Sequence, residues 1–405
     1  MKFRTPLVLI AGAATVALLA GCQASPADEA PVPADGTALG DGHGAIAGAQ
    51  ELAEPALHLT SIGADGVVHH LDLLDETSET LGEIDPVDTV DSEGRFLFAG
   101  RDGAVSIIDS GVWTWNHVDH FHYYEAPAKT IGELVGDGAP TTVISDLGAG
   151  VSFGGGEAVL LDFDALKQGD IVERFRLEVE PGDGMVVPLP VGALVADPSA
   201  GELRHVDADG ADLTAVPCID PSGSISTNVG VVVGCEDAAV LAVTGADGTS
   251  FERIAYPEGS TERAVAFAAR ENRPTVAGFT GTSAIWLLDT RERAWSRIDA
   301  GEPIVRVAAV DDADEHVVAL TADGAVLVLS AATGERLART EPLVGASLAD
   351  PALAGGVTLA VDQNRTYLNG PAEHIMFELD IADGARTART FDAPHSPLHL
   401  VETGR

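Results

Sequence analysis

A strand–turn–strand unit recurs along most of this chain. Short runs of β-branched and apolar residues alternate with Gly-containing turns, and helical periodicity is scarce. The unit is an apolar strand, a turn such as Asp-Gly, and a second strand that commonly ends in Asp. It occurs at 57–74, 95–111, 192–210, 231–248, 275–293, 316–334 and 365–384.

The spacing of these units, about 40–45 residues, is that of a four-stranded propeller blade. A single hairpin cannot bury its apolar faces, whereas blades stacked around an axis can. We therefore predict an all-β fold, a seven- or eight-bladed β-propeller, over residues 45–405. A parallel β-solenoid is the competing fold, but its repeats are shorter and more regular. Pairs such as Asp102-Gly103 are interpreted as turns and not as calcium ligands.

The first 22 residues have the pattern of a bacterial lipoprotein signal. Lys2 and Arg4 precede an apolar run that is too short to span a membrane comfortably, and the run ends in "LAGC". We expect a signal peptide over 1–22, with Cys22 lipidated in the mature protein. An ordinary signal peptide that happens to contain Cys22 is the alternative.

Residues 23–44 predict a flexible, disordered tether. They are rich in Ala, Pro, Asp and Gly, so they bury too little apolar surface to offset the entropy lost on ordering. With the signal, this tether predicts an extracytoplasmic protein that is held to the bacterial cell membrane by its lipid anchor only.

The chain is strongly acidic, with 23 Lys+Arg against 63 Asp+Glu and a net charge of −40. Such a surface argues against nucleic acid and against anionic lipid headgroups as partners. The charge favours a solvated surface and attracts cations, but it names no ligand. We expect a monomer.

Two cysteines remain once Cys22 is assigned to lipid. Cys218 and Cys235 form an even pair, and outside the cytosol we predict that they form a disulfide. A reactive or metal-binding thiol is the alternative.

Histidines gather in the segment 113–124, "WTWNHVDHFHYY", which holds three of the chain's twelve histidines. In an extended strand His120 and His122 lie on one face, and a turn over 116–119 would bring His117 or Asp119 to the same site. Imidazoles with a carboxylate or water suit Zn²⁺ better than calcium or magnesium. The alternative is that these histidines only pack among the aromatic residues.

The remaining histidines are interpreted individually. His43, in "GDGHGAI", either folds over a nearby metal site or is solvated, and both interpretations stay open. His69 and His70 alternate sides of a strand and are expected at the surface or lining the channel. His374, His395 and His399 are expected to be structural. The sequence contains no GxSxG nucleophile motif and no cofactor signature, so we expect no enzymatic activity.

Several segments together resemble one known family. They are the Gly-His N-terminal loop, "IIDSGVWTW" with "DHFHYY", the two cysteines 17 positions apart, and the C-terminal "NRTYLNGPAEHIMFELDIADGARTARTF" with "ETGR". This combination is similar to the zinc metallochaperones of the AztD type, secreted β-propellers that accompany a zinc ABC importer. The resemblance covers most of 43–405.

The resemblance implies zinc binding outside the membrane and direct delivery of zinc to the importer's solute-binding protein. The positions that match the family's motifs are His43, His117, His120 and His122.

The chain also departs from the family's pattern. Later His-Gly elements are replaced by "ISDLG" at 144–148, "GDG" at 182–184 and "SGSI" at 222–225, so Asp146 and Asp183 are candidate oxygen ligands in their place. The alternative function is a propeller scaffold or interaction lipoprotein whose metal site has degenerated.

Overall fold

The computed structural model describes residues 44–117, 120–197, 199–363 and 365–405. The chain divides into two compact units, Met1–Ala38 and Leu39–Arg405, and every described residue belongs to the second. The predicted signal peptide, Cys22, His43 and Asp119 lie outside the described residues. Within those residues, no helix is long and apolar enough to cross a membrane.

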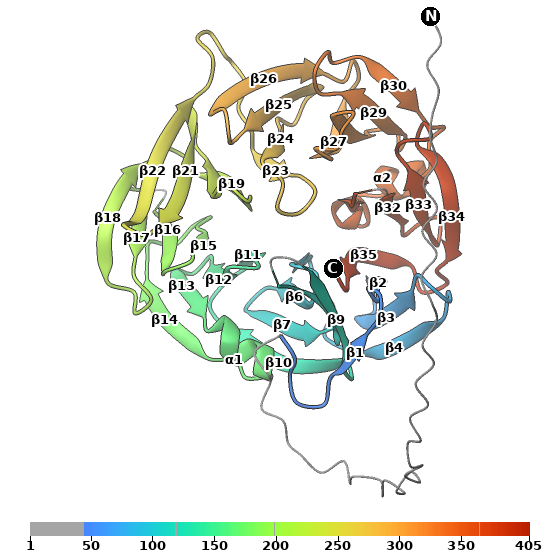
Figure 1. Cartoon of the computed structure of the whole chain (residues 1–405), viewed down its shortest axis with the longest axis horizontal. Coiled ribbons are helices and arrows are strands. Elements are labelled where there is room, and N and C mark those ends of the chain that lie inside the picture. Colours follow the sequence, from blue (N-terminus) through green and yellow to red (C-terminus); the bar gives the residue numbers. More distant parts are fainter. Residues whose placement is uncertain (1–43, 118–119, 198, 364) are drawn as a thin grey trace, which may run out of the picture. The chain divides into compact units, whose positions relative to one another are not determined.

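Eight four-stranded antiparallel sheets stand side by side in a ring (Figure 1). Four of them, given from one edge strand to the other, are β35 (Pro397–Thr403), β2 (His58–Gly63), β3 (Val67–Asp72), β4 (Ser78–Glu83); β5 (Thr89–Ser92), β6 (Phe96–Arg101), β7 (Ala104–Asp109), β10 (Lys129–Val135); β11 (Pro140–Ser145), β12 (Gly148–Phe153), β13 (Glu157–Leu161), β14 (Glu173–Glu178); and β15 (Val186–Pro188), β16 (Ala193–Asp197), β17 (Glu202–Val206), β18 (Asp212–Pro217).

The other four continue the ring in chain order. They are β19 (Ser222–Ser226), β20 (Val231–Gly234), β21 (Ala238–Gly245), β22 (Gly248–Ala255); β23 (Ala266–Ala268), β24 (Thr275–Phe279), β25 (Ala284–Asp289), β26 (Ala294–Asp299); β27 (Ile304–Ala309), β28 (His316–Thr321), β29 (Val326–Ser330), β30 (Arg336–Arg339); and β31 (Leu359–Val361), β32 (Arg365–Gly370), β33 (Ile375–Asp380), β34 (Arg386–Asp392). The prediction of an all-β propeller is confirmed, and the solenoid alternative is wrong.

The ring closes because the last strand joins the first blade. β35 pairs with β2, and the hydroxyl groups of Thr60 and Thr403 lie 3.0 Å apart. The C-terminal residue, Arg405, lies inside the ring (Figure 1). Residues close to both ends of the described chain therefore meet in one sheet.

The hydrophobic core lies between neighbouring sheets. Phe96, Phe98 and Ile107 of one sheet pack with Val151 and Phe153 of the next, and all five are at most 1% exposed. This packing explains the repeat, since each sheet hides its apolar faces only against its neighbours.

Short helices and one disulfide complete the unit. The helices are α1 (Phe163–Gln168), α2 (Gly345–Ala349) and the 3₁₀ turn η1 (Ala354–Gly356). α1 begins at Asp162, whose carboxylate accepts the backbone N–H groups of residues 164 and 165. Cys218 and Cys235 form a disulfide, with their Cα atoms 5.2 Å apart and both side chains fully buried.

Candidate metal centre

A three-stranded sheet outside the blades carries the histidine-rich segment. After β7 the chain forms the hairpin of β8 (Val112–Asn116) and β9 (Phe121–Glu125), then returns as β10 to pair with β7. The short strand β1 (Gln50–Leu52) pairs with the free edge of β9. The hairpin is thus an insertion between two neighbouring strands of one blade.

The turn of this hairpin sets the histidines close together. Trp115 pairs with His122, Asn116 pairs with Phe121, and the backbone N–H of His117 donates to the carbonyl oxygen of His120 over 2.8 Å. The expectation of a turn just after Asn116 agrees with this register. His120 lies at the end of the turn and is exposed, whereas His117 and His122 are half-buried.

Three interactions hold the hairpin against the ring and the N-terminal segment. The indole N–H of Trp113 donates to the carbonyl oxygen of Gly44 over 3.2 Å, and the hydroxyl of Thr114 donates to the carbonyl oxygen of Gly404 over 2.7 Å. The guanidinium of Arg95 lies 3.9 Å from the centroid of the Trp113 ring. The hairpin is therefore a fixed part of the fold.

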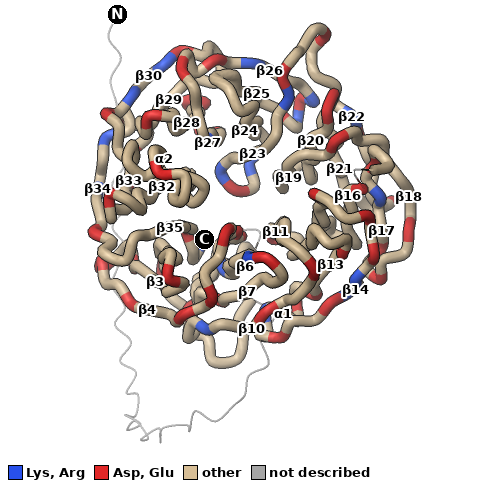
Figure 2. The backbone as a smooth tube through the Cα atoms, turned by 180° about the vertical axis from the view of Figure 1, so that it is seen from behind, with Lys and Arg blue, Asp and Glu red and all other residues tan. Residues whose placement is uncertain are grey.

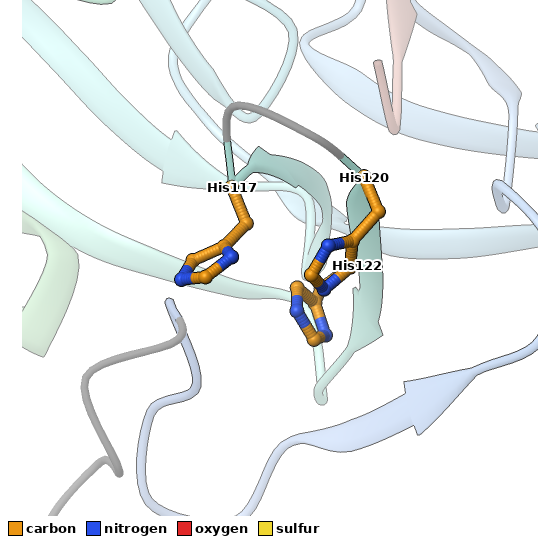
Figure 3. A group of neighbouring side chains, drawn as sticks. All are labelled: His117, His120 and His122. Carbon is orange, nitrogen blue, oxygen red and sulfur yellow. The ribbon is translucent and has the colours of Figure 1, made fainter.

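His117, His120 and His122 form one compact group (Figure 3). One ring nitrogen from each lies within 4.8 Å of the others, and the ring centroids are 4.7 to 5.9 Å apart. Among the described residues this is the one group of three or more His, Cys, Asp or Glu side chains with that geometry. The triad can hold a metal ion.

The spacing of the triad can be compared with that of a metal site. Two imidazole nitrogens on a tetrahedral zinc ion are about 3.4 Å apart, since each Zn–N distance is about 2.1 Å. The triad's separations exceed that value by at most about 1.4 Å, the order of a side-chain rotation at the tip of a hairpin. No backbone rearrangement is needed for the three side chains to converge on one ion.

Glu51, which the sequence interpretation did not single out, contacts the triad from β1. Its Oε1 lies 2.6 Å from Nδ1 of His122. Glu51 faces Tyr124 across the pairing of β1 with β9, so its side chain is diagonal to His122. A three-residue strand has no recognisable sequence pattern, and this contact spans 71 positions along the chain.

The two candidate oxygen ligands lie apart from the triad. Asp183 is exposed in the loop between β14 and β15. Asp146 borders two cavities, one of about 560 Å³ beside the hairpin and one of about 200 Å³. Neither residue belongs to the histidine group. His43 and Asp119 lie outside the described residues, so their roles stay predictions.

Carboxylates line the cavity beside the hairpin. Its lining includes Trp113 and Trp115 together with Glu93 and Glu271, and Arg405 lies between carboxylates there. The loop between β23 and β24, which carries Glu271, reaches into the ring with neighbouring basic residues (Figure 2). Burial raises the pKa of Glu93 to about 8, and it also raises the pKa values of Glu271 and Asp146.

Four other histidines form two stacked pairs. His58 stacks on His70 with ring centroids 4.0 Å apart, and His69 stacks on His395 at 3.6 Å. His70 is only 3% exposed, so the prediction that it lies at the surface or lines the channel is wrong. Its ring is buried against His58 and bonds to Thr60, because β2 and β3 are neighbours.

Known proteins resemble this chain at the level of structure. No family model and no curated protein sequence matches the chain. Apo AztD from Citrobacter koseri superposes with a TM-score of 0.75 and 21% identity, covering 87% of this chain and 98% of that chain. The chain shares the fold of AztD. A crystal structure of AztD from the same organism gives a TM-score of 0.73 at 21% identity, covering 87% and 99% of the two chains.

A more distant propeller also matches. Chaetomium thermophilum Sqt1, bound to the N-terminus of the ribosomal protein L10, gives a TM-score of 0.53 at 13% identity, covering 81% of this chain and 95% of that chain. The AztD structures are more similar by every one of these measures. The resemblance to the AztD type that the sequence suggested is therefore confirmed in the fold.

Proposed function

We propose that this protein is an extracytoplasmic metallochaperone that binds Zn²⁺ at His117, His120 and His122 and delivers it to the solute-binding protein of a zinc ABC transporter. The observation that carries the proposal is the triad, three imidazoles within 4.8 Å on one hairpin tip. The AztD fold and the sequence resemblance support the same function.

The chemistry of the triad favours a borderline transition metal. Imidazole nitrogen is a preferred ligand of zinc, copper and nickel, whereas calcium and magnesium prefer oxygen. Zinc accepts three protein ligands and leaves a fourth tetrahedral position for water or for another molecule. Imidazole must be neutral to bind, so metal affinity should fall in acid.

The position of the triad suits transfer of the ion. His120 is exposed at the tip of the hairpin, so an acceptor protein can approach it without entering the ring. A fourth position that is not filled by a strongly bound protein ligand lets an acceptor's ligand enter before the donor's histidines leave. Zinc is the cargo of this exchange.

Two candidates remain for a fourth ligand. His43 directly precedes Gly44, whose carbonyl oxygen accepts the hydrogen bond from Trp113. Trp115 in turn lies 5.1 Å from the ring of His117, so the described chain begins beside the triad. Asp119 lies in the sequence between His117 and His120. We propose that His43 strengthens retention of zinc without being essential for it.

We also propose that the protein works at the outer surface of the bacterial cell membrane, held by lipid on Cys22. The support is the "LAGC" signal and the Pro-rich, acidic stretch that follows it. The variant Cys22→Ser should accumulate unprocessed and unlipidated. Normal processing and release of that variant would contradict the anchor.

A competition experiment tests delivery. Zinc-loaded protein is mixed with the metal-free solute-binding protein of a zinc ABC transporter, in the presence of excess chelator that captures free zinc. Direct transfer predicts that the acceptor fills while the chelator does not, and that His120→Ala/His122→Ala delivers nothing. If all zinc goes to the chelator, delivery by contact is wrong. If the wild-type protein holds no zinc, the scaffold alternative takes its place.

A further inference from the structure

We infer that Glu51 is a positioning residue for the metal site, and that through it the docking of β1 is linked to metal occupancy. The inference rests on the proposed zinc binding and goes beyond it. It assigns a role to a residue outside the histidine-rich segment, and it makes the short N-terminal strand part of the site.

The geometry places Glu51 behind a ligand. Its Oε1 is 2.6 Å from Nδ1 of His122, a distance typical of a charge-assisted hydrogen bond. β1 has only three residues, and its ladder consists of three pairs with β9, Gln50 with Glu125, Glu51 with Tyr124, and Leu52 with Tyr123. The side-chain contact therefore adds substantially to a short backbone ladder.

The contact selects the nitrogen that can bind metal. An ionised carboxylate only accepts hydrogen bonds, so Nδ1 of His122 must carry the proton that it donates to Glu51. In neutral imidazole the other nitrogen then holds the lone pair, and Nε2 becomes the metal ligand. A carboxylate in this place also fixes the ring's orientation and raises its basicity.

The linkage follows from the same hydrogen bond. A metal ion on Nε2 polarises the imidazole and strengthens the Nδ1–H bond to Glu51, so zinc should hold β1 more firmly. By thermodynamic reciprocity, a docked β1 must then raise the affinity for zinc by the same factor. A partner that displaced β1 would weaken the site, which gives the protein a route to release its cargo.

The size of the effect is limited by solvent. The side chain of Glu51 is 58% exposed, whereas that of His122 is 16% exposed. Removing the partner of a metal-bound histidine typically costs 10- to 100-fold in affinity. Because this carboxylate is largely hydrated, we expect the lower end, about 10-fold.

The first test compares zinc affinity among variants at position 51, measured by chelator competition on the full chain. Glu51→Ala should weaken zinc binding about 10-fold. Glu51→Gln keeps an acceptor oxygen and should lie between Glu51→Ala and wild type. Glu54→Gln, an exposed carboxylate two residues after β1, is the matched control and should bind like wild type. Equal affinities for wild type and Glu51→Ala would overturn the inference.

The second test needs no metal. In the metal-free protein, ¹⁵N NMR of the histidine side chains should show His122 protonated at Nδ1 in wild type, and a shift towards the Nε2-protonated form in Glu51→Ala. Amide exchange over 50–52 should slow on adding zinc to wild type and change less in Glu51→Ala. An unchanged tautomer in Glu51→Ala contradicts the positioning role even if the wild-type protein fails to bind zinc. The two proposals can thus fail separately.

Discussion

The guanidinium of Arg95 lies 3.9 Å from the ring centroid of Trp113 and is also held by two hydrogen bonds to Asp109, at 2.9 and 2.8 Å. Arg95 directly precedes β6, Asp109 ends β7, and Trp113 belongs to the hairpin. The side chains of Arg95 and Asp109 are 7% and 3% exposed. A buried ion pair in one blade therefore supports the base of the metal-binding hairpin.

Asp109→Ala should destabilise the fold strongly, because it leaves the buried Arg95 charge without its partner. We expect the free energy of unfolding to fall by about 3–5 kcal/mol, measured by urea denaturation. The control is Asp383→Ala, whose ion pair with Arg386 is exposed on both sides, and which should cost less than about 1 kcal/mol. Similar losses for the two variants would contradict the assigned role of Arg95 and Asp109.

Gly44→Ala should weaken the metal site, because a Cβ atom there would lie only 2.3 Å from Cγ of Trp115. That ring lies 5.1 Å from His117 and 5.8 Å from His122, so displacing it disturbs the triad. Gly48→Ala is the control, since its φ of 85° is close to the 81° of Gly44 but its Cβ would meet nothing within 4 Å. Zinc affinity should drop for Gly44→Ala only, and equal affinities would show that the Trp115 contact is unimportant.

The double variant Cys218→Ser/Cys235→Ser should lose about 3 kcal/mol of unfolding free energy, the value expected for a loop of this length in the chain-entropy model. The bond links residues 17 positions apart, and both cysteines belong to a core cluster that contains no residue of the hairpin. Zinc stoichiometry should therefore stay as in wild type. An unaltered urea midpoint would show that the bond adds nothing to stability.

Stability should fall as the pH rises above neutrality. Burial raises the pKa of Glu93 to about 8, and burial together with neighbouring carboxylates raises the pKa of Glu402 to about 7. The unfolded chain releases these protons near pH 4.5, so folding favours the protonated forms, and this contribution is lost as the pH rises through about 7 to 8. Glu93→Gln should flatten the loss in urea melts at pH 7 and 8.5. A steeper loss in that variant would contradict the assignment.

On the acid side the histidines act in the opposite direction. Burial lowers the pKa of His70 to about 3, and burial together with the neighbouring His69 lowers the pKa of His395 to about 4. These contributions are present above the unfolded value of 6.5 and are lost as the pH falls towards those values. Unfolding free energy should therefore be greatest near pH 6 to 7, as urea melts from pH 5 to 8.5 would show.

The fold could be predicted because its information is local. Each blade repeats one strand–turn–strand pattern, so units such as 95–111 and 316–334 are recognisable from their own residues, and β6–β7 and β28–β29 fall where those units lie. The triad was accessible for the same reason, since His117, His120 and His122 lie within six residues.

The contacts that the sequence did not reveal are long-range ones. Glu51 meets His122 only because β1 pairs with β9, and His69 meets His395 only because β35 closes the ring beside β2. No periodicity of either segment encodes such a pairing. The proposed substitution of histidine ligands by Asp146 and Asp183 also depended on spatial positions, and the structure does not group either residue with the triad.

Zinc stoichiometry of the purified protein tests the central claim most directly. Wild-type protein is dialysed against buffered zinc and compared with His120→Ala/His122→Ala and with His374→Asn, which replaces an exposed histidine in a left-handed turn with a residue that tolerates this conformation. We predict about one zinc ion per chain for wild type and for His374→Asn, and essentially none for the double variant. If the double variant holds as much zinc as wild type, the triad is not the metal site, and the proposed function fails with it.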